Sequence, residues 1–100
     1  NNIKIHLDRQ NKHVLGKHNL QEGKSIFTHN NPQKLLEKFA GKGEKVRGNF
    51  GESGYQEIIN FGEDIGYSLT QDGIKTPTSW GKIHYSKDGA HIVPTIPRKI

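Results

Sequence analysis

Cysteine and methionine are absent from this sequence, and hydrophobic residues make up only 30% of its 100 positions. Without cysteine the chain has no disulfide framework and no thiol nucleophile. Long apolar runs are also missing, and no basic segment followed by an apolar one opens the chain, so we expect a soluble domain that contacts no membrane. Because the chain begins Asn1-Asn2 and lacks methionine, we expect a single domain, residues 1–100, from the C-terminal end of a longer protein.

Familiar catalytic motifs are incomplete in this chain. The segment Gly51-Glu52-Ser53-Gly54-Tyr55 ends in tyrosine where the nucleophile elbow of a serine hydrolase requires glycine. The glycines between residues 41 and 48 have the wrong spacing for a dinucleotide fingerprint or a P-loop. The acids Glu63-Asp64 have no histidine at ligand spacing, so we expect neither a metal site nor a cofactor.

Positive charge is concentrated in the first half of the chain. Residues 1–50 carry ten Lys or Arg against four acids, whereas residues 51–100 carry five against six. Focused positive potential attracts phosphates and releases their counterions. The charge pattern therefore favours a polyanionic partner, and ordinary surface lysines are the alternative.

Local patterns predict an α+β fold. Ile3, Ile5 and Leu7 alternate with polar residues as in a half-buried strand. Asn31 and Pro32 predict the start of a helix that Gly41 ends. The other expected elements are a loop or irregular short helix over 8–25, a mobile loop over 41–54, strands over 57–61 and 65–69, a turn at 71–73 and a strand entering through 76–78. Together they predict an N-terminal helical region packed on an antiparallel sheet of about four strands.

The segment 81–94 predicts a β-hairpin that places two histidines on one face. If Asp88-Gly89 is a two-residue turn, His84 lies opposite Val93, and His91 is its diagonal neighbour at about 7–8 Å. Ser86 shares their face, and Tyr85 falls on the more apolar side. If the alternation runs from Thr76 onward, Thr78, Trp80 and Lys82 also join the histidine face. Two imidazoles so placed can flank a phosphodiester, or both can be solvated strand residues.

Histidine and lysine are sufficient for the chemistry of RNA cleavage. The reaction needs a base for the 2′-hydroxyl proton, an acid for the departing 5′-oxygen and cations for the phosphoryl oxygens. Histidine titrates near neutrality and can act as either the base or the acid. His84 and His91 are placed by the hairpin, and His13 and His18 lie in the basic N-terminal segment.

Several motifs resemble the bacterial polymorphic toxin type 50 domain. They are Gln10-Asn11-Lys12-His13-Val14, Gly16-Lys17-His18-Asn19, Gly23-Lys24-Ser25, Leu35-Leu36, Ala40-Gly41-Lys42-Gly43-Glu44, Pro77-Thr78, Ile83-His84-Tyr85-Ser86-Lys87 and Gly89-Ala90-His91-Ile92-Val93-Pro94. The resemblance implies a ribonuclease toxin of the fold group of barnase, EndoU, colicin ribonucleases and RelE, carried on secreted or contact-delivered bacterial proteins. It also implies a cognate immunity protein. By carry-over, Lys12, His13, Ser25, Thr78, His84, Tyr85, Ser86 and His91 match recurring polar positions, and His18 matches more loosely.

The leading hypothesis is a metal-independent RNA endonuclease toxin that leaves a 2′,3′-cyclic phosphate and acts in the cytoplasm of a target bacterium. His13 and His84 are expected as acid and base, in unassigned order. His91 and Thr78 would hold the phosphate or orient an imidazole, and Lys12 with Lys24 would stabilise charge.

The expected substrate-contacting residues are Lys24, Ser25, Lys82, Tyr85, Ser86, Trp80 and His18. Trp80 would stack an unpaired base or be a partly buried aromatic, Tyr85 would pack or contact RNA, and the two serines would bond substrate or only backbone. The expected partners are tRNA, rRNA or mRNA and an acidic immunity protein. The alternatives are a nucleic-acid-binding module without catalysis and a structural or interaction segment of a phage or secreted protein.

Overall fold

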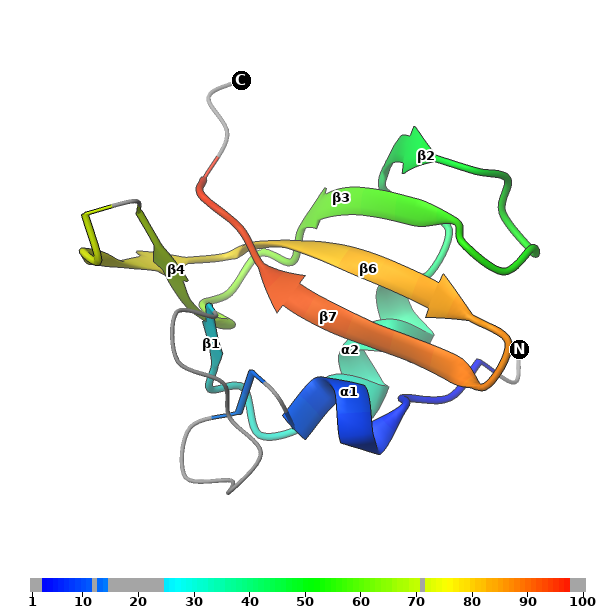
Figure 1. The fold of residues 1–100 in the computed structure, drawn as a ribbon, viewed down its shortest axis with the longest axis horizontal. Coiled ribbons are helices and arrows are strands. Elements are labelled where there is room, and N and C mark those ends of the chain that lie inside the picture. The colour runs from blue at the N-terminus through cyan, green and yellow to red at the C-terminus, as the bar shows by residue number, and fades with distance from the viewer. Residues whose placement is uncertain (1–2, 12, 15–24, 71, 98–100) are drawn as a thin grey trace.

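The part of the chain that the structure describes forms two antiparallel sheets and two helices. The computed structural model describes residues 3–11, 13–14, 25–70 and 72–97. Its elements are α1 (Leu7–Asn11), β1 (Ile26–Phe27), α2 (Pro32–Phe39), β2 (Glu44–Arg47), β3 (Gln56–Asn60), β4 (Gly66–Leu69), β5 (Lys75–Thr78), β6 (Trp80–Ser86) and β7 (Gly89–Pro94) (Figure 1). The four-stranded sheet has the order β2-β3-β6-β7 and the three-stranded sheet β1-β4-β5. The predicted α+β class is confirmed. No helix in the described ranges is long and apolar enough to cross a membrane.

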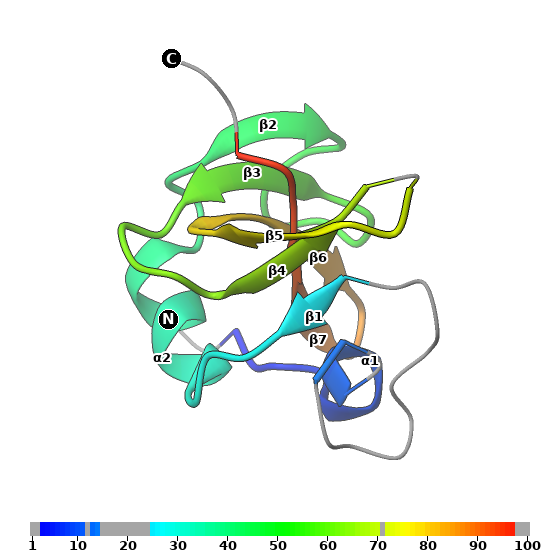
Figure 2. The same cartoon turned by 90° about the vertical axis from the view of Figure 1, so that its left-hand side faces the viewer.

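A single apolar cluster joins α2 to both sheets. Leu35 and Leu36 on α2 pack with Ile83 and Ile92 of the larger sheet and with Phe27 of the smaller one. Figure 2 shows α2 to one side of the two sheets, with α1 beside β7 and β1. One face of the β6–β7 hairpin is therefore committed to the core, which leaves its other face for polar side chains.

The helix α2 begins and ends where the sequence predicts. Asn31 Oδ1 accepts a hydrogen bond from Lys34 N at 3.1 Å, which is the usual role of an N-cap residue. Pro32 occupies the start of the helix. Gly41 follows with a φ of 84°, a left-handed conformation that favours glycine.

The N-terminal segment does not form the predicted strand. Ile5 makes only a single parallel bridge to Ala90, and the chain then enters α1 at Leu7, which is 67% exposed. The side chain of Gln33 on α2 bonds Ile3 O and Ile5 N, each at 2.9 Å. The backbone on that side of the segment is thereby satisfied by an amide side chain rather than by another strand.

Two further expectations about strands are wrong. The segment 41–54 is not simply a loop, because β2 lies within it and pairs with β3 through a bulge between Lys45 and Arg47. All residues of β2 are exposed, so the strand shows no apolar alternation by which to recognise it. The segment 76–84 is not one strand either, because β5 belongs to the smaller sheet and β6 to the larger one.

The β6–β7 hairpin forms with a register two residues away from the predicted one. Ser86 pairs with Gly89 across a turn centred on Lys87-Asp88, and His84 lies directly opposite His91 rather than opposite Val93. Gly89, with a φ of 132°, is the position where a Cβ would lie 2.6 Å from Lys4 O. The glycine thus permits the N-terminal segment to approach β7 and is not a central residue of the turn.

Candidate active site: a histidine cluster

Two histidines of the β6–β7 hairpin meet a third, His13, from the N-terminal segment. The His84 and His91 rings stack with centroids 4.9 Å apart and planes at 16°, and the His13 ring lies 6.0 Å from His91 at 15°. His91 is therefore in the middle of a row of three imidazoles, which we call the histidine cluster. The direct His84–His91 pairing in the hairpin brings these two rings closer than the predicted diagonal arrangement would.

His13 is held in the cluster by backbone contacts. Its N–H donates to Gln10 O at 3.0 Å, its carbonyl accepts from Phe27 N, and its side chain is only 6% exposed. His13 Nδ1 lies 3.2 Å from Ser25 O. Because a carbonyl only accepts, this contact requires a proton on Nδ1 and leaves the lone pair of the neutral ring on Nε2.

A buried amide side chain attaches α1 to β7. Gln10 Nε2 donates to Ile92 O at 2.9 Å, and Gln10 Oε1 accepts from Ile92 N at 2.7 Å. Two residues earlier on β7, Ala90 makes the corresponding bonds to Lys4 O and His6 N, both at 2.7 Å. Lys4 and His6 pair with Ala90, and Gln10 extends this pairing along the edge of β7 to Ile92. The Gln10 contact thereby holds His13 next to His91.

Burial keeps the hairpin histidines neutral. Burial first, and then the charges of Lys82, His13 and Arg9, lower the pKa of His84 to about 4. Burial, followed by the neighbouring His84, lowers the pKa of His91 to about 3. Both rings are consequently unprotonated at pH 7 and can accept a proton.

The surroundings of the cluster suit an anion better than a metal ion. Arg9 on α1 and Lys82 on β6 act on the imidazoles as positive charges. A bound phosphate would be attracted by these charges and would reverse the lowering of the histidine pKa values. Among the described residues, no three His, Asp or Glu side chains are arranged to hold a metal ion.

The other predicted site residues divide between the cluster face and the interior. Trp80 and Lys82 share the face of His84, because they alternate along β6 with buried residues. Thr78 is buried on β5, and its hydroxyl is engaged with the backbone N and O of Trp80 at 3.0 and 3.4 Å. We therefore omit Thr78 from the proposed site. Lys12, His18 and Lys24 lie outside the described residues.

Tyr85 lies on the core side of the hairpin, as predicted. Its hydroxyl donates to the buried carboxylate of Glu57, which also accepts from Gly41 N at 2.8 Å and Gly43 N at 2.7 Å. Burial and the bond to Glu57 raise the pKa of Tyr85, so it remains a neutral donor. The phenol group is thus used to hold the segment that follows α2, not to meet a substrate at the cluster.

The two predicted serines make different contacts. Ser86 Oγ donates to Gly89 O at 2.7 Å, across the hairpin turn. Ser25 places its carbonyl against His13, while its buried Oγ has no hydrogen-bond partner among the described residues. Ser25 therefore contributes to the cluster through its backbone.

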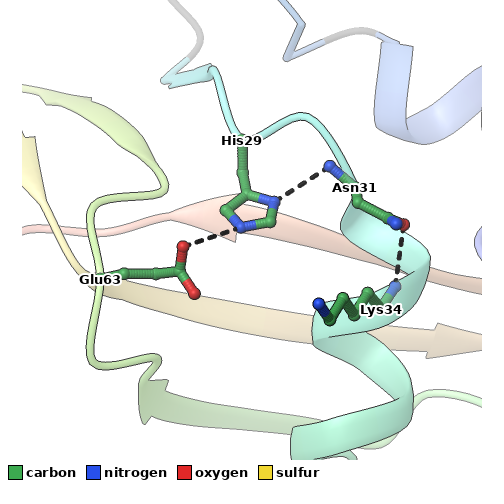
Figure 3. A network of polar contacts seen from close by, with 4 residues as sticks. All are labelled: His29, Asn31, Lys34 and Glu63. Atoms are coloured by element: carbon green, nitrogen blue, oxygen red, sulfur yellow. Dashed lines mark hydrogen bonds and ion pairs between the residues drawn. The ribbon is translucent and has the colours of Figure 1, made fainter.

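His29 forms a separate network on the surface near α2 (Figure 3). Asn31 N donates to His29 Nδ1 at 3.0 Å, and His29 Nε2 lies 3.1 Å from Glu63 Oε1. Both ring nitrogens are occupied, and the contact connects the loop before α2 to the loop before β4. These contacts give His29 a structural role apart from the histidine cluster.

Sequence reasoning missed Gln10 and Arg9 as parts of the site. The sequence stretch that contains them shows no alternation, and a glutamine that pairs with a strand edge has no local signature. For Gln10 the available signal was its place three residues before His13 in the motif Gln10-Asn11-Lys12-His13-Val14, and Arg9 lies outside that motif.

The fold and the cluster define a small basic α+β domain with neutral imidazoles gathered beside cationic side chains. The family model described as bacterial toxin 50 (Ntox50) matches residues 5–94, which include all three histidines of the cluster. The chain therefore belongs to this bacterial toxin family, and the suspected toxin role is confirmed. Among curated proteins, no sequence matches the chain.

Proposed function

We propose that this toxin domain is a metal-independent endoribonuclease that acts through the histidine cluster. The observation that supports the proposal is the row His13–His91–His84, whose imidazoles lie close together beside Arg9 and Lys82. A positioned base and acid, with cations for the phosphoryl oxygens, meet the needs of phosphodiester cleavage in RNA.

In the proposed reaction the 2′-hydroxyl of one nucleotide attacks the adjacent phosphorus. One of His13 and His84 removes the hydroxyl proton, and the other protonates the departing 5′-oxygen. The P–O5′ bond breaks as the new P–O2′ bond forms, which leaves a 2′,3′-cyclic phosphate and a free 5′-hydroxyl. His91, between the two, would bond the phosphate, while Lys82 and Arg9 would stabilise its charge.

Substrate binding favours protonation of the acid, which takes its proton from solvent. The histidine pKa values are low in the free domain because burial and neighbouring positive charges oppose protonation. A phosphodiester brings a negative charge against the rings and favours the imidazolium form. The domain would therefore take up a proton when it binds RNA, and one imidazole would become a donor only with substrate in place.

RNA cleavage in EDTA tests this proposal. Purified domain is incubated with total RNA, with DNA of matched length, and with RNA plus Mg²⁺, and the new RNA ends are analysed chemically. We expect cleavage of RNA alone, independent of metal, with cyclic phosphate ends. Cleavage of DNA, or activity lost in EDTA and restored by a divalent ion, contradicts the mechanism. A gel shift without cleavage supports the binding-module alternative, and inertness supports the structural one.

His6 provides a matched control for the cluster. It lies just before α1, where its Nδ1 accepts a hydrogen bond from Arg9 N at 3.4 Å, and it acts on His91 as a charge. Because His6 lies outside the row of three imidazoles, His6→Ala should cleave RNA at close to the wild-type rate. His13→Ala and His84→Ala should not. Equal losses in all three variants would indicate general damage to the N-terminal segment rather than removal of acid and base.

We also propose that a cognate immunity protein with an acidic surface covers the cluster, and that the domain is delivered from a secreted or contact-dependent parent protein to the cytoplasm of a target bacterium. Lys12 and Lys24 are proposed to stabilise charge on the RNA, and His18 is proposed as a further substrate contact. Opposite charges accelerate association most at low salt. Association rates measured across a salt series should therefore fall as salt rises, and a flat profile would exclude charge steering.

A further inference from the structure

The face of the larger sheet that carries His84 and His91 extends beyond the hairpin. Figure 1 shows β7, β6, β3 and β2 side by side in this order. The apolar cluster that contains α2 occupies the opposite face of the sheet. On β3 the half-buried Gln56 precedes the fully buried Glu57, so Gln56 belongs to the same face as the two histidines. We call this surface the histidine face.

One row of polar side chains crosses the histidine face from edge to edge. His91 on β7 pairs with His84 on β6. On the other side of His84 lies Gln56 of β3, and Gln56 in turn pairs with Arg47 of β2. Neighbouring strands are about 4.8 Å apart, so this polar row spans about 14 Å from β7 to β2. It continues the histidine cluster across the whole sheet.

A bulge in β2 places Arg47 on the histidine face. Lys45 lies opposite Glu57, Arg47 lies opposite Gln56, and Val46 is the extra residue between them. Two residues of a regular strand at this spacing would share a face. Because of the bulge they do not: Arg47 joins the polar row, whereas Lys45 is on the side of the buried Glu57.

Arg47 and Gln56 have groups that a ligand can use. Within the described residues, Arg47 forms no ion pair and the Gln56 amide forms no hydrogen bond. Tyr85 N donates to Tyr55 O at 3.0 Å, which makes the adjacent Gln56–His84 pair a non-hydrogen-bonded one. Side chains approach most closely in such a pair. The Gln56 amide is therefore a near neighbour of the His84 ring.

The neighbouring row on the histidine face suits a polyanion less well. It consists of Val93, Lys82 and Ile58 and ends at Glu44 on β2. A carboxylate at that end repels phosphate. Positive charge at the β2 edge of the histidine face therefore lies at the end of the polar row, with Arg47.

We propose that Arg47 binds a second phosphate of the RNA, and that the strand runs from the histidine cluster along the polar row to the edge of β2. The proposal rests on the proposed endoribonuclease function, since it extends the same site. A guanidinium can donate two parallel N–H groups to a phosphate. Gln56 would bond the nucleotide between the two phosphates, because its amide both donates and accepts.

This path links the direction of the RNA to the roles of the histidines. His84 is the end of the histidine cluster nearest Gln56, and His13 is the other end. The nucleotide on the 5′ side of the scissile phosphate carries the attacking 2′-hydroxyl, and the one on the 3′ side carries the departing 5′-oxygen. If the 3′ part of the strand passes over Arg47, His84 is the acid. If the 5′ part does so, His84 is the base.

Salt-dependent binding of a strand that cannot be cleaved tests the Arg47 site. A single-stranded 2′-deoxy oligonucleotide lacks the attacking hydroxyl, and its affinity is measured by fluorescence anisotropy. The slope of log affinity against log salt is about −0.7 per phosphate contact for single strands, so Arg47→Gln should flatten the slope by about 0.7. Lys45→Gln is the matched control, because it removes the same charge from the other face of β2, and it should keep the wild-type slope. Equal slopes in the two variants would overturn the proposal.

Chimeric oligonucleotides test the direction of the strand. A ribonucleotide step that the domain cleaves is extended with deoxynucleotides on its 5′ side or on its 3′ side, so that only one bond can be cut. Extension on one side should raise kcat/KM for the wild-type domain, and Arg47→Gln should lower that gain by up to about fivefold, as expected for an exposed ion pair. Lys45→Gln should retain the gain, and the side that responds assigns acid and base.

The results separate this proposal from the enzymatic one. Equal losses for both extensions in Arg47→Gln, or no loss, would refute the path along the polar row while RNA cleavage itself stands. A domain that cleaves no RNA, but whose slope depends on Arg47 and not on Lys45, would support the phosphate site and contradict the endoribonuclease function.

Discussion

The bond between Gln10 and Ile92 predicts a linked loss of stability and activity. Gln10→Leu introduces an apolar side chain of similar size and removes both hydrogen bonds to Ile92, which is fully buried. The Ile92 N–H and C=O would then lack partners on that side. An unsatisfied buried polar group costs roughly 1–3 kcal/mol, so the variant should lose about 2–6 kcal/mol. The total free energy of unfolding of a domain of this size is about 5–15 kcal/mol.

A second substitution, Gln10→Glu, should make the stability of the domain relative to wild type depend on pH. In Gln10→Glu the protonated carboxyl can still donate to Ile92 O and accept from Ile92 N, whereas the carboxylate can only accept. The folded state therefore raises the pKa of the introduced carboxyl above its usual 4.3 or so. Its stability relative to wild type is retained below about pH 4.3 and lost as pH rises through the raised pKa, by up to about 1.4 kcal/mol per unit.

Urea unfolding of wild type, Gln10→Leu and Gln10→Glu between pH 4 and 8 measures both effects. Gln33→Leu is the matched control, because Gln33 makes the same pair of bonds to Ile3 and Ile5 but contacts none of the three cluster histidines. Under folding conditions, Gln10→Leu should cleave RNA far more slowly than Gln33→Leu at equal folded fraction. Equal activities, or a Gln10→Glu variant whose relative stability does not change with pH, would refute this account of how His13 is positioned.

Three further predictions concern the cluster and the hairpin. His13→Ala and His84→Ala should each reduce RNA cleavage by about 10²–10⁴-fold with the fold intact, and an active, folded His84→Ala variant would contradict the assignment. Because the pKa values of His84 and His91 are lowered to about 4 and 3, stability should fall as pH drops below about 6.5, by at most about 1.4 kcal/mol per unit and group before solvent screening. A His84→Asn/His91→Asn variant should flatten this dependence in urea unfolding across pH. Gly89→Ala should destabilise the domain more than Gly62→Ala, since both glycines have positive φ but only at Gly89 would a Cβ meet the backbone, 2.6 Å from Lys4 O; equal melting temperatures would show that the contact is unimportant.

The hairpin illustrates which features a sequence determines locally. The predicted faces of β6 and β7 are correct, because the observed register differs by two residues and a shift of two preserves the alternation of side chains. The register itself is wrong. Asp88-Gly89 is a strong turn signal on its own, but Gly89 is needed where Lys4 and His6 approach the strand, a contact that spans more than 80 residues of sequence.

The same distinction explains the helices and β2. The helix α2 was predictable because Asn31, Pro32 and its apolar stripe lie within ten residues or so of one another and act on the backbone directly. The strand β2 was not, since its exposed residues follow no period and its pairing depends on β3. The alternation of Ile3 and Ile5 predicted a strand, but the amide of Gln33 forms the backbone hydrogen bonds of that segment instead. Nothing in the local sequence indicates this contact with α2.

The candidate site required both kinds of information. The sequence could nominate His13, His84 and His91 by residue type and place two of them on one hairpin face. It could not bring His13 to them, because that depends on the outer edge of β7, where Ala90 pairs with Lys4 and His6 and Ile92 pairs with Gln10. An edge strand must be covered in some way. Here the N-terminal segment that pairs with the edge of β7 also places the His13 ring next to His91. The same contacts therefore cover the sheet edge and assemble the histidine cluster.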